Sequence, residues 1–561
     1  MGGPGRNLRR PLHRERHLTT RRDFLADAAG AVAGIAGAPA ILGASRAQHD
    51  LVIRGGNVVD GTGTPAVEMD VGVTGGRIAA VSRRLADRGS VEIDARGLAV
   101  APGFIDIHSH ADGSLFSDPR SESVIRQGIT TIVVGQDGGS QFPSRNAAEE
   151  SGTPSFAALA ARIEALPSAV NVASMIGLGS VRGIVVGPDD RPATPAELTR
   201  MTAMVRDAIA AGACGASSGL EYTPGAFASR AELATLCGPL AAAGLPYATH
   251  MRNEDDRLLD SIDESIEVAR TARCPLQISH LKTQGPRNWG KLDEVFQRIE
   301  QARAGGLDVA FDRYPYIAYQ TGLTNLFPVW SRDGGTAAFF RRLDDAPTAD
   351  RIRRETLAKV DLIGGWDNVL ISGVGRGGDT TAEGKRLGAF ASSKGTDPYE
   401  AAITLLRGAN GSVGMVGFAM SEENLERILA HPLGTVCSDG GGFAVDGPSR
   451  RGSPHPRGLG TFPRVLGRYV RERKALTLEQ AVYKMSALPA SRIQLRDRGR
   501  IARNLAADLV VFDPATVADK ATFEEPFQYP VGIRAVVVNG QIALRDGERG
   551  GRGSGRALRP N

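Results

Sequence analysis

The chain has 561 residues, of which 42% are hydrophobic and 23% are charged, and its formal net charge is +5. This length exceeds that of a usual single domain, so we expect one large domain with an accessory domain. Residues 1–47 carry eight Arg against three acidic groups, which leaves 59 basic and 59 acidic residues in the rest. A near-neutral remainder argues against nucleic acid as a partner, because binding phosphates usually requires a basic patch.

Residues 1–47 are typical of an export signal. Thr20-Arg21-Arg22-Asp23-Phe24-Leu25 resembles a twin-arginine motif, and a stretch rich in Ala and Gly follows from Ala28 to Gly43. This stretch is shorter than the ~20 residues that span a bilayer, so we expect no stable membrane anchor. We predict export through the twin-arginine pathway to the periplasm or the exterior, and a disordered basic tail is the alternative.

Short β-rich runs separated by turns occur near both ends of the remaining chain. The first set lies within residues 48–100 and the second within residues 496–561, where 507–513 and 533–540 are rich in Val. Strands isolated at the two ends need partners, because unpaired edges are exposed to aggregation. We therefore predict that both ends pair into one small β-sandwich beside the main domain.

Between these ends, in residues 101–495, apolar strand-like runs alternate with helical stretches, which indicates a parallel sheet with helical crossovers. Eight runs are present, the number that closes an α/β barrel of the (β/α)₈ TIM type. The gap before the last run is too long for one crossover, so we expect an insertion at about 325–425. The runs are Gly103–His108, Thr131–Gly135, Val172–Leu178, Gly215–Leu220, Pro246–His250, Leu276–His280, Asp308–Phe311 and Gly434–Cys437.

Histidines stand at the carboxyl ends of several of these runs. His108 and His110 are two residues apart, so in an extended segment they face the same side and can hold one ion. His250 ends the fifth run and His280 the sixth, and the carboxyl ends of barrel strands meet at one mouth. Asp439 follows the eighth run, where a carboxylate can act as general base and general acid. The sequence therefore predicts a metal-dependent hydrolase.

Two other sets of residues carry no such signal. The cysteines lack a Cys-x-x-Cys pair, which argues against a zinc ribbon or a disulfide framework, so we expect buried free thiols. The remaining histidines lie in loops or at chain ends, and we expect them at the surface. These residues are Cys214, Cys237, Cys274 and Cys437, and His49, His431 and His455.

These motifs resemble those of the amidohydrolase superfamily, and more closely those of the D-aminoacylases, the N-acyl-D-amino-acid deacylases. The resemblance covers essentially the whole chain after residue 47, including its first strand-like run and its last. The segments that carry it are Pro102-Gly103-Phe104-Ile105-Asp106-Ile107-His108-Ser109-His110, Thr249-His250-Met251-Arg252, Ile278-Ser279-His280-Leu281-Lys282 and Ser438-Asp439.

The resemblance implies one or two zinc ions, with His250 and His280 holding the tighter ion and His108 and His110 the weaker one. Family members commonly have a Cys ligand in a Gly-Asn-Cys-Gly turn after the second strand. Here the turn is Gly135-Gln136-Asp137-Gly138. Asp137 can still bind the metal, but a carboxylate is harder than a thiolate and favours Mn²⁺ relatively more.

The implied reaction is hydrolysis of the linear amide bond of an N-acyl-D-amino acid to a carboxylate and a free D-amino acid. Metal-activated water attacks the acyl carbon, and Asp439 takes the proton and delivers it to the departing amine. The D configuration comes from the resemblance alone. The predicted partner is this small substrate, and we make no prediction of the oligomeric state.

Recognition of such a substrate requires a cation for its carboxylate. Lys282 and Arg457 are candidates, since a guanidinium can bind a carboxylate with two hydrogen bonds. Tyr222 and Tyr316 follow the fourth and seventh runs, and their hydroxyls could polarise the scissile carbonyl or bind substrate.

Three alternatives remain open. An amidohydrolase acting on a cyclic amide commonly uses a carbamylated Lys, and Gly215–Tyr222 contains no Lys. Gly215-Ala216-Ser217-Ser218-Gly219 fits the Gly-x-Ser-x-Gly pattern of serine hydrolases, although it lies inside an expected barrel strand. An exported binding protein that kept the barrel without catalysis is the third alternative.

Overall fold

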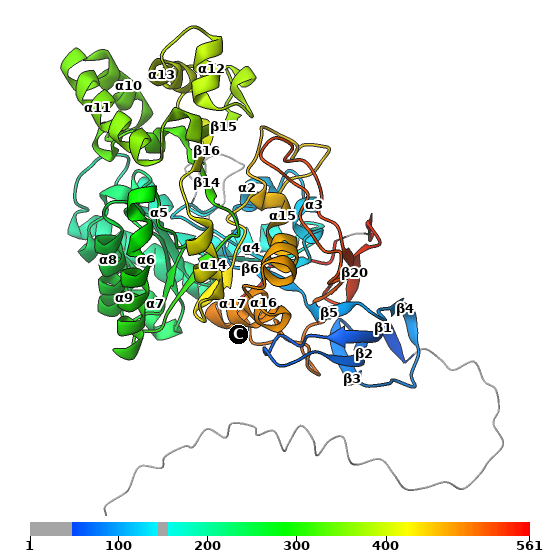
Figure 1. The fold of residues 1–561 in the computed structure, drawn as a ribbon. Helices are drawn as coiled ribbons and strands as arrows, with labels where there is room; N and C mark the ends of the chain where they lie inside the picture. Colours follow the sequence, from blue (N-terminus) through cyan, green and yellow to red (C-terminus); the bar gives the residue numbers. More distant parts are fainter. Residues whose placement is uncertain (1–47, 144–154, 552) are drawn as a thin grey trace, which may run out of the picture. The chain divides into compact units, whose positions relative to one another are not determined.

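The computed structural model describes residues 48–143, 155–551 and 553–561, and the predicted export signal lies outside these ranges. They form a barrel of parallel strands, a largely antiparallel sheet built from both ends of the chain, and an insertion (Figure 1). Within the described ranges, none of the helices combines the length and the apolar character that crossing a membrane requires.

The barrel strands follow one another in chain order around the ring. They are β6 (Phe104–Asp106), β7 (Ile129–Val134), β8 (Asn171–Ser174), β9 (Ile176–Gly177), β10 (Ala216–Gly219), β11 (Tyr247–His250), β12 (Leu276–Ile278), β13 (Val309–Arg313) and β17 (Gly434–Val436). β8 and β9 are one barrel position interrupted at Met175, whose N–H donates to the carbonyl of Val134 at 2.9 Å. The ring closes after β17, where the N–H of Asp439 donates to the carbonyl of His108 at 2.8 Å. The predicted (β/α)₈ barrel is therefore confirmed.

Helices cover the outside of the barrel. They include α4 (Phe156–Glu164), α5 (Leu178–Val185), α6 (Pro195–Ala210), α7 (Arg230–Ala243), α8 (Leu258–Ala272), α9 (Leu292–Ala304), α14 (Glu422–Ala430), α15 (Arg457–Arg464), α16 (Leu478–Met485) and α17 (Ala487–Arg492). α6 begins with a capping box between Thr194 and Glu197 and buries Met201, Val205 and Ala208, which lie on one helical face. Because helices cover it, β7 is buried at every position.

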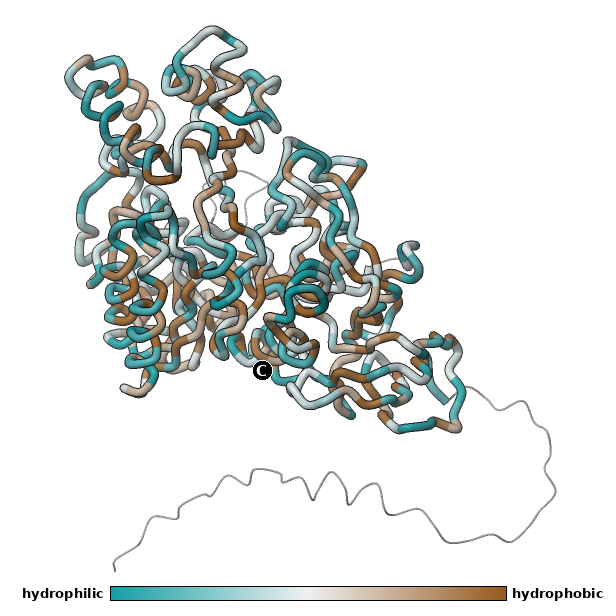
Figure 2. The backbone as a smooth tube through the Cα atoms, viewed as in Figure 1, coloured by the Kyte–Doolittle hydropathy of each residue, from teal (hydrophilic) through white to brown (hydrophobic). Residues whose placement is uncertain are grey.

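Both ends of the described chain pair in one nine-stranded sheet, as predicted. Its strands are β1 (His49–Val58), β2 (Val67–Thr74), β3 (Arg77–Ser82), β4 (Gly89–Asp94), β5 (Ala99–Pro102), β18 (Leu509–Phe512), β19 (Ile533–Val538), β20 (Gln541–Arg545) and β21 (Glu548–Arg549). β18 runs antiparallel to β5, with Val510 opposite Ala101. Alternate residues such as Leu51, Ile53 and Leu509 enter one apolar core, and Figure 2 shows the hydrophobic stretches along these strands.

An insertion lies between β13 and β17. It contains the antiparallel strands β14 (Ala318–Gly322), β16 (Val413–Phe418) and β15 (Val369–Val374), and the helices α10 (Gly335–Asp344), α11 (Ala346–Leu362), α12 (Leu387–Ser393) and α13 (Pro398–Gly408). Lys359 of α11 donates to Asp255, and Asn325 donates to Glu221 at 2.9 Å. The insertion is therefore tied to the loops that follow β10 and β11.

The chain-end pairing predicts a large cost for truncating its core. Leu509 is 0% exposed, whereas Leu357 on α11 is 38% exposed. We expect Leu509→Ala to lower the free energy of unfolding by about 2–5 kcal/mol, because it removes buried methyl groups and leaves a cavity. Urea denaturation measures this change. The matched Leu357→Ala variant should unfold close to the unmodified protein, and equal losses in both variants would contradict the assigned core.

Candidate metal centre

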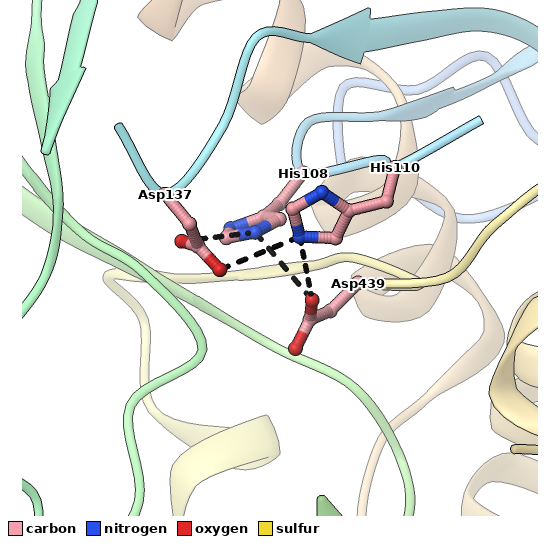
Figure 3. A group of neighbouring side chains, drawn as sticks. All are labelled: His108, His110, Asp137 and Asp439. Atoms are coloured by element: carbon pink, nitrogen blue, oxygen red, sulfur yellow. Dashed lines mark ion pairs between the residues drawn. The ribbon is translucent and has the colours of Figure 1, made fainter. Parts of the chain in front are cut away.

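Six predicted site residues converge at the carboxyl ends of the barrel strands, where parallel strands open into one mouth. They form two groups that share one member, and in each group one ligand atom per residue lies within 4.8 Å of the others. Figure 3 shows the first group drawn together from separate loops. The groups are His108, His110, Asp137 and Asp439, and Asp137, His250 and His280.

Asp137 is the shared member, and its carboxylate faces all four histidines. Oδ1 lies 3.4 Å from Nε2 of His108. Oδ2 lies 3.4 Å from Nε2 of His110, 3.7 Å from Nδ1 of His250 and 3.5 Å from Nε2 of His280. The substitution of Asp for the expected Cys thus places two oxygens, rather than one sulfur, between the histidines.

These residues fit a divalent cation. Two ligands about 2.0–2.1 Å from a tetrahedral zinc ion lie roughly 3.3 Å apart, close to the separations around Asp137. Nδ1 of His250 and Nε2 of His280 are 2.9 Å apart. Both ring nitrogens of His108 and Oδ1 of Asp137 are buried without a hydrogen-bond partner. Buried polar atoms rarely lack a partner, so this arrangement is one that a bound ion satisfies.

The carboxylates and imidazoles shift one another's pKa. Burial alone would raise the pKa of Asp137, but His108 and His280 hold it well below its usual value. Burial opposes protonation of His110, yet Asp137 and Asp439 raise the pKa of its ring to about 9. The cluster therefore attracts positive charge, and a metal ion that binds there displaces protons from the rings.

A carboxylate stands behind each of three histidines. Oδ1 of Asp312 lies 3.5 Å from Nδ1 of His108. Oε1 of Glu254 lies 3.1 Å from Nδ1 of His280, and Oε2 of Glu221 lies 3.4 Å from Nε2 of His250. Metal-binding histidines commonly have such partners, which orient the ring.

These three backing carboxylates were not predicted from the sequence. Their positions carried a signal, because Asp312 lies in β13, Glu221 follows β10 and Glu254 is four residues beyond the histidine that ends β11. Acidic residues just after barrel strands were therefore candidates, although their partners could not be assigned without the fold.

The backbone is strained at three of the clustered residues. Asp137, His280 and Asp439 have φ values of 52°, 37° and 48°, in the left-handed region that non-glycine residues seldom adopt. Such conformations persist only where surrounding contacts enforce them, and they concentrate at functional sites. The turns after β7, β12 and β17 thus aim their side chains at the cluster.

The two carboxylate oxygens of Asp439 face different partners, Arg457 and the histidine cluster. Its Oδ2 lies 2.7 Å from Nη1 of Arg457, and its Oδ1 lies 3.2 Å from Nε2 of His110. Burial favours the neutral acid, but Arg457 and the neighbouring rings hold the pKa of Asp439 well below its usual value. One oxygen is therefore anchored by Arg457, and the other faces the cluster as part of an ionised carboxylate.

His455 holds the loop that carries Arg457. Its Nδ1 accepts a hydrogen bond from the N–H of Arg457 at 3.0 Å, and its Nε2 donates to the carbonyl of Ala318 at 3.0 Å. The expectation that His455 lies at the surface is wrong, because it is 1% exposed. His49 is also buried, where its Nδ1 contacts the Thr74 hydroxyl at 2.9 Å. Both rings were misjudged because loop position in the sequence does not report packing.

A cavity of about 650 Å³ opens over the cluster. Lys282 lines it, but its Nζ is 2.7 Å from both oxygens of Glu254, so this cation is already paired. Tyr222 also lines it, with its hydroxyl 3.5 Å from Nδ1 of His250. All four cysteines are free and buried, as expected.

Of the two predicted tyrosines, Tyr316 lies elsewhere. Its hydroxyl is 3.5 Å from Asp519, and the described cavity lining includes Tyr314 in its place. The hydroxyl of Tyr314 is buried without a hydrogen-bond partner. The described lining thus holds the first rather than the second tyrosine of the Tyr-Pro-Tyr segment, because the direction of a side chain after a strand depends on the turn.

The serine alternative lacks its base. Oγ of Ser217 donates to the carbonyl of Gly135 at 2.6 Å. Oγ of Ser218 contacts the hydroxyls of Tyr247 at 2.7 Å and Thr249 at 2.8 Å. Among the described residues neither serine hydrogen-bonds to a histidine, as an activated nucleophile requires.

The shared position of Asp137 predicts unequal effects of two substitutions on metal content. Asp137→Asn removes a carboxylate from both groups, whereas His110→Asn alters only the first. We expect Asp137→Asn to weaken retention of all bound zinc by at least about tenfold, the loss seen when even a partner of a ligand is removed. His110→Asn should retain the ion held by His250 and His280. Metal analysis after dialysis tests this, and full occupancy in Asp137→Asn would contradict the shared ligand.

Comparisons with known proteins agree with this architecture. The amidohydrolase family matches residues 91–350 and 442–544. A D-aminoacylase of Alcaligenes xylosoxydans xylosoxydans is 36% identical, with 91% of this chain and 97% of the relative covered. An N-acyl-D-glutamate deacylase from Bordetella bronchiseptica was solved with zinc and a phosphonate inhibitor. It superposes with a TM-score of 0.79 at 34% identity, and the match covers 91% of this chain and 99% of that chain. A D-aminoacylase described as having a binuclear metal centre superposes with a TM-score of 0.78 at 36% identity, and the match covers 91% of this chain and 100% of that chain. The chain therefore belongs to the amidohydrolase family, within its D-aminoacylase group.

Proposed function

We propose that this protein is a zinc-dependent deacylase that hydrolyses the amide bond of N-acyl-D-amino acids to a carboxylate and a free D-amino acid. The observation that carries the proposal is the Asp137-centred cluster of four histidines, with the ionised Oδ1 of Asp439 facing it. The D configuration rests on the names of the relatives, which are D-aminoacylase and N-acyl-D-aspartate and N-acyl-D-glutamate deacylases.

His108, His110, Asp137, His250 and His280 would hold one or two zinc ions, and Mn²⁺ is an alternative because Asp137 supplies oxygen instead of sulfur. When bound, the metal supplies Lewis acidity, which polarises a carbonyl group and lowers the pKa of water. The backing carboxylates would keep the rings oriented toward the ion.

The chain's own residues would perform the proton transfers. Oδ1 of Asp439 is placed to accept a proton from the attacking water while Arg457 holds Oδ2. The oxygen of the water bonds to the acyl carbon, and the carbon–nitrogen bond then breaks. As it breaks, Oδ1 of Asp439 gives the proton to the departing amine nitrogen. The hydroxyl of Tyr222 would donate to the carbonyl oxygen, and Arg457 and Tyr314 would face the substrate carboxylate.

A cyclic amide is the second candidate substrate, since the same hydrolytic chemistry would open it. No Lys lies in β10 or in the two residues after it, where a carbamylated ligand would stand, and the carboxylate of Asp137 fills the shared position instead. This donor set favours the linear amide.

We also propose that the protein is exported. Support comes from the motif at residues 20–25 and the Ala- and Gly-rich stretch at 28–43. The twin-arginine pathway carries folded proteins, which suits a chain that acquires metal before transport.

Hydrolysis of four model substrates tests the activity. We expect the zinc-loaded protein to release amino acid from N-acetyl-D-methionine or N-acetyl-D-glutamate, and far less from their L-enantiomers. Chelation should abolish the release and added zinc should restore it. A 5-substituted hydantoin serves as the cyclic comparison, and its preferential hydrolysis would move the assignment to cyclic amides. Full activity after complete metal removal would contradict the mechanism.

The Asp439→Asn variant separates proton transfer from folding. We expect kcat to fall by about 10²- to 10⁴-fold, the usual contribution of general acid–base catalysis. Asp446→Asn is the matched control, because Asp446 lies in the following loop with its side chain 70% exposed. It should leave kcat unchanged, and normal turnover by Asp439→Asn would remove Asp439 from the mechanism.

A further inference from the structure

A second cavity, of about 910 Å³, adjoins the metal centre. The two cavities share lining residues, including Asp137, Ser140, Ser180 and Tyr222. Tyr222, whose hydroxyl lies 3.5 Å from Nδ1 of His250, is also part of the lining of the second cavity. A substrate whose amide lies over the cluster can therefore extend one arm past Tyr222 into this second space.

One cation lines this second cavity. In the described lining, Arg332 is the sole basic residue and Asp137 the sole acidic one. Arg332 belongs to the short 3₁₀ helix Val329–Arg332 in the insertion, and Gly334, which also lines the cavity, donates its N–H to Pro188 at 3.2 Å. The insertion thus contributes a positive charge to the lining of a cavity that Asp137 of the metal centre also lines.

The guanidinium of Arg332 is buried and largely unpaired. The residue is 8% exposed, and its Nη2 donates to the backbone carbonyl of Glu221 at 3.1 Å. Its Nε has no hydrogen-bond partner, and no carboxylate of the described residues forms an ion pair with it. Burial lowers the pKa of Arg332, yet a guanidinium remains charged at neutral pH.

Three other buried cations of the described chain differ from Arg332 in this respect, because each has a carboxylate partner. Arg182 is paired with Glu232, Lys282 with Glu254, and Arg457 with Asp439 at 2.7 Å. A buried charge without a counterion is costly, so a ligand carboxylate that pairs with Arg332 would be strongly favoured. The planar fork of a guanidinium suits a carboxylate, which can accept two parallel hydrogen bonds.

We propose that the second cavity is a subsite for a second carboxylate of the substrate, which pairs with Arg332. The inference rests on the proposed deacylase function and narrows it to substrates with an anionic arm in addition to the amino acid carboxylate. That arm has two possible sources, an acidic D-amino acid side chain or an acyl group that ends in a carboxylate, and both present the same chemistry to Arg332.

Two pairs of substrates distinguish the sources. N-acetyl-D-glutamate and N-acetyl-D-glutamine differ in the side-chain arm, whereas N-succinyl-D-alanine and N-succinamoyl-D-alanine differ in the acyl arm. Each pair exchanges a carboxylate for a carboxamide of the same shape. We expect the zinc-loaded protein to favour the acidic member of one pair in kcat/KM by about tenfold or more, as for a charge-assisted hydrogen bond. The substrate pair in which the acidic member is preferred shows whether the side chain or the acyl group carries the carboxylate that binds Arg332.

Variants of Arg332 test the assignment. Arg332→Gln should bring the acidic-to-neutral ratio of kcat/KM close to one, and Arg332→Lys, which keeps the charge, should preserve part of it. Zinc content and thermal unfolding establish that each variant is folded. Arg353→Gln is the matched control, because Arg353 in α11 pairs with Glu400 and Asp397 and lines neither cavity. Its ratio should equal that of the unmodified protein.

The outcomes separate the two proposals. Hydrolysis of both members of each pair at equal rates would overturn the subsite while leaving the deacylase function intact. An acidic preference that survives in Arg332→Gln would also overturn it, because another group would then bind the carboxylate. Failure of the zinc-loaded protein to hydrolyse any of the four amides would instead contradict the deacylase function, and the subsite inference with it.

Discussion

The contact on which the site depends is the carboxylate of Asp137 between four imidazoles. Its two oxygens lie 3.4–3.7 Å from a nitrogen of each ring, so it belongs to both ligand groups. A thiolate offers one soft donor atom, whereas a carboxylate offers two hard ones. A cation beside these oxygens would account for three features together: the ring nitrogens that face Asp137, the strained turns and the backing carboxylates.

The barrel provides the rigidity that such a contact needs. Ligands come from strands far apart in the chain, and the closure after β17 brings Asp439 against the backbone of His108. The insertion adds a different contribution, because it lines the second cavity and ties itself to the loops after β10 and β11 through Asn325 and Lys359. The turns after the barrel strands therefore position the clustered side chains, and the insertion contributes to the lining of the second cavity.

Much of this arrangement could be predicted from the sequence. Alternating apolar runs located all eight barrel strands to within a few residues, and histidines at their ends identified the candidate metal ligands, which the structure brings together. Side-chain direction in turns could not be predicted, which is why Tyr316 was chosen over Tyr314. The burial of isolated polar residues could not be predicted either. His455 was therefore expected at the surface, and nothing in the sequence indicated that Arg332 is buried. Local patterns encode elements, whereas these contacts depend on segments that meet only after folding.

The most direct test is anomalous diffraction at the zinc absorption edge from crystals of the zinc-loaded protein. We expect at least one anomalous peak within about 2.0–2.2 Å of a carboxylate oxygen of Asp137, with His250 and His280 as further ligands. A zinc ion bound elsewhere, or bound by these histidines while Asp137 remains uncoordinated, would contradict the central role of this carboxylate.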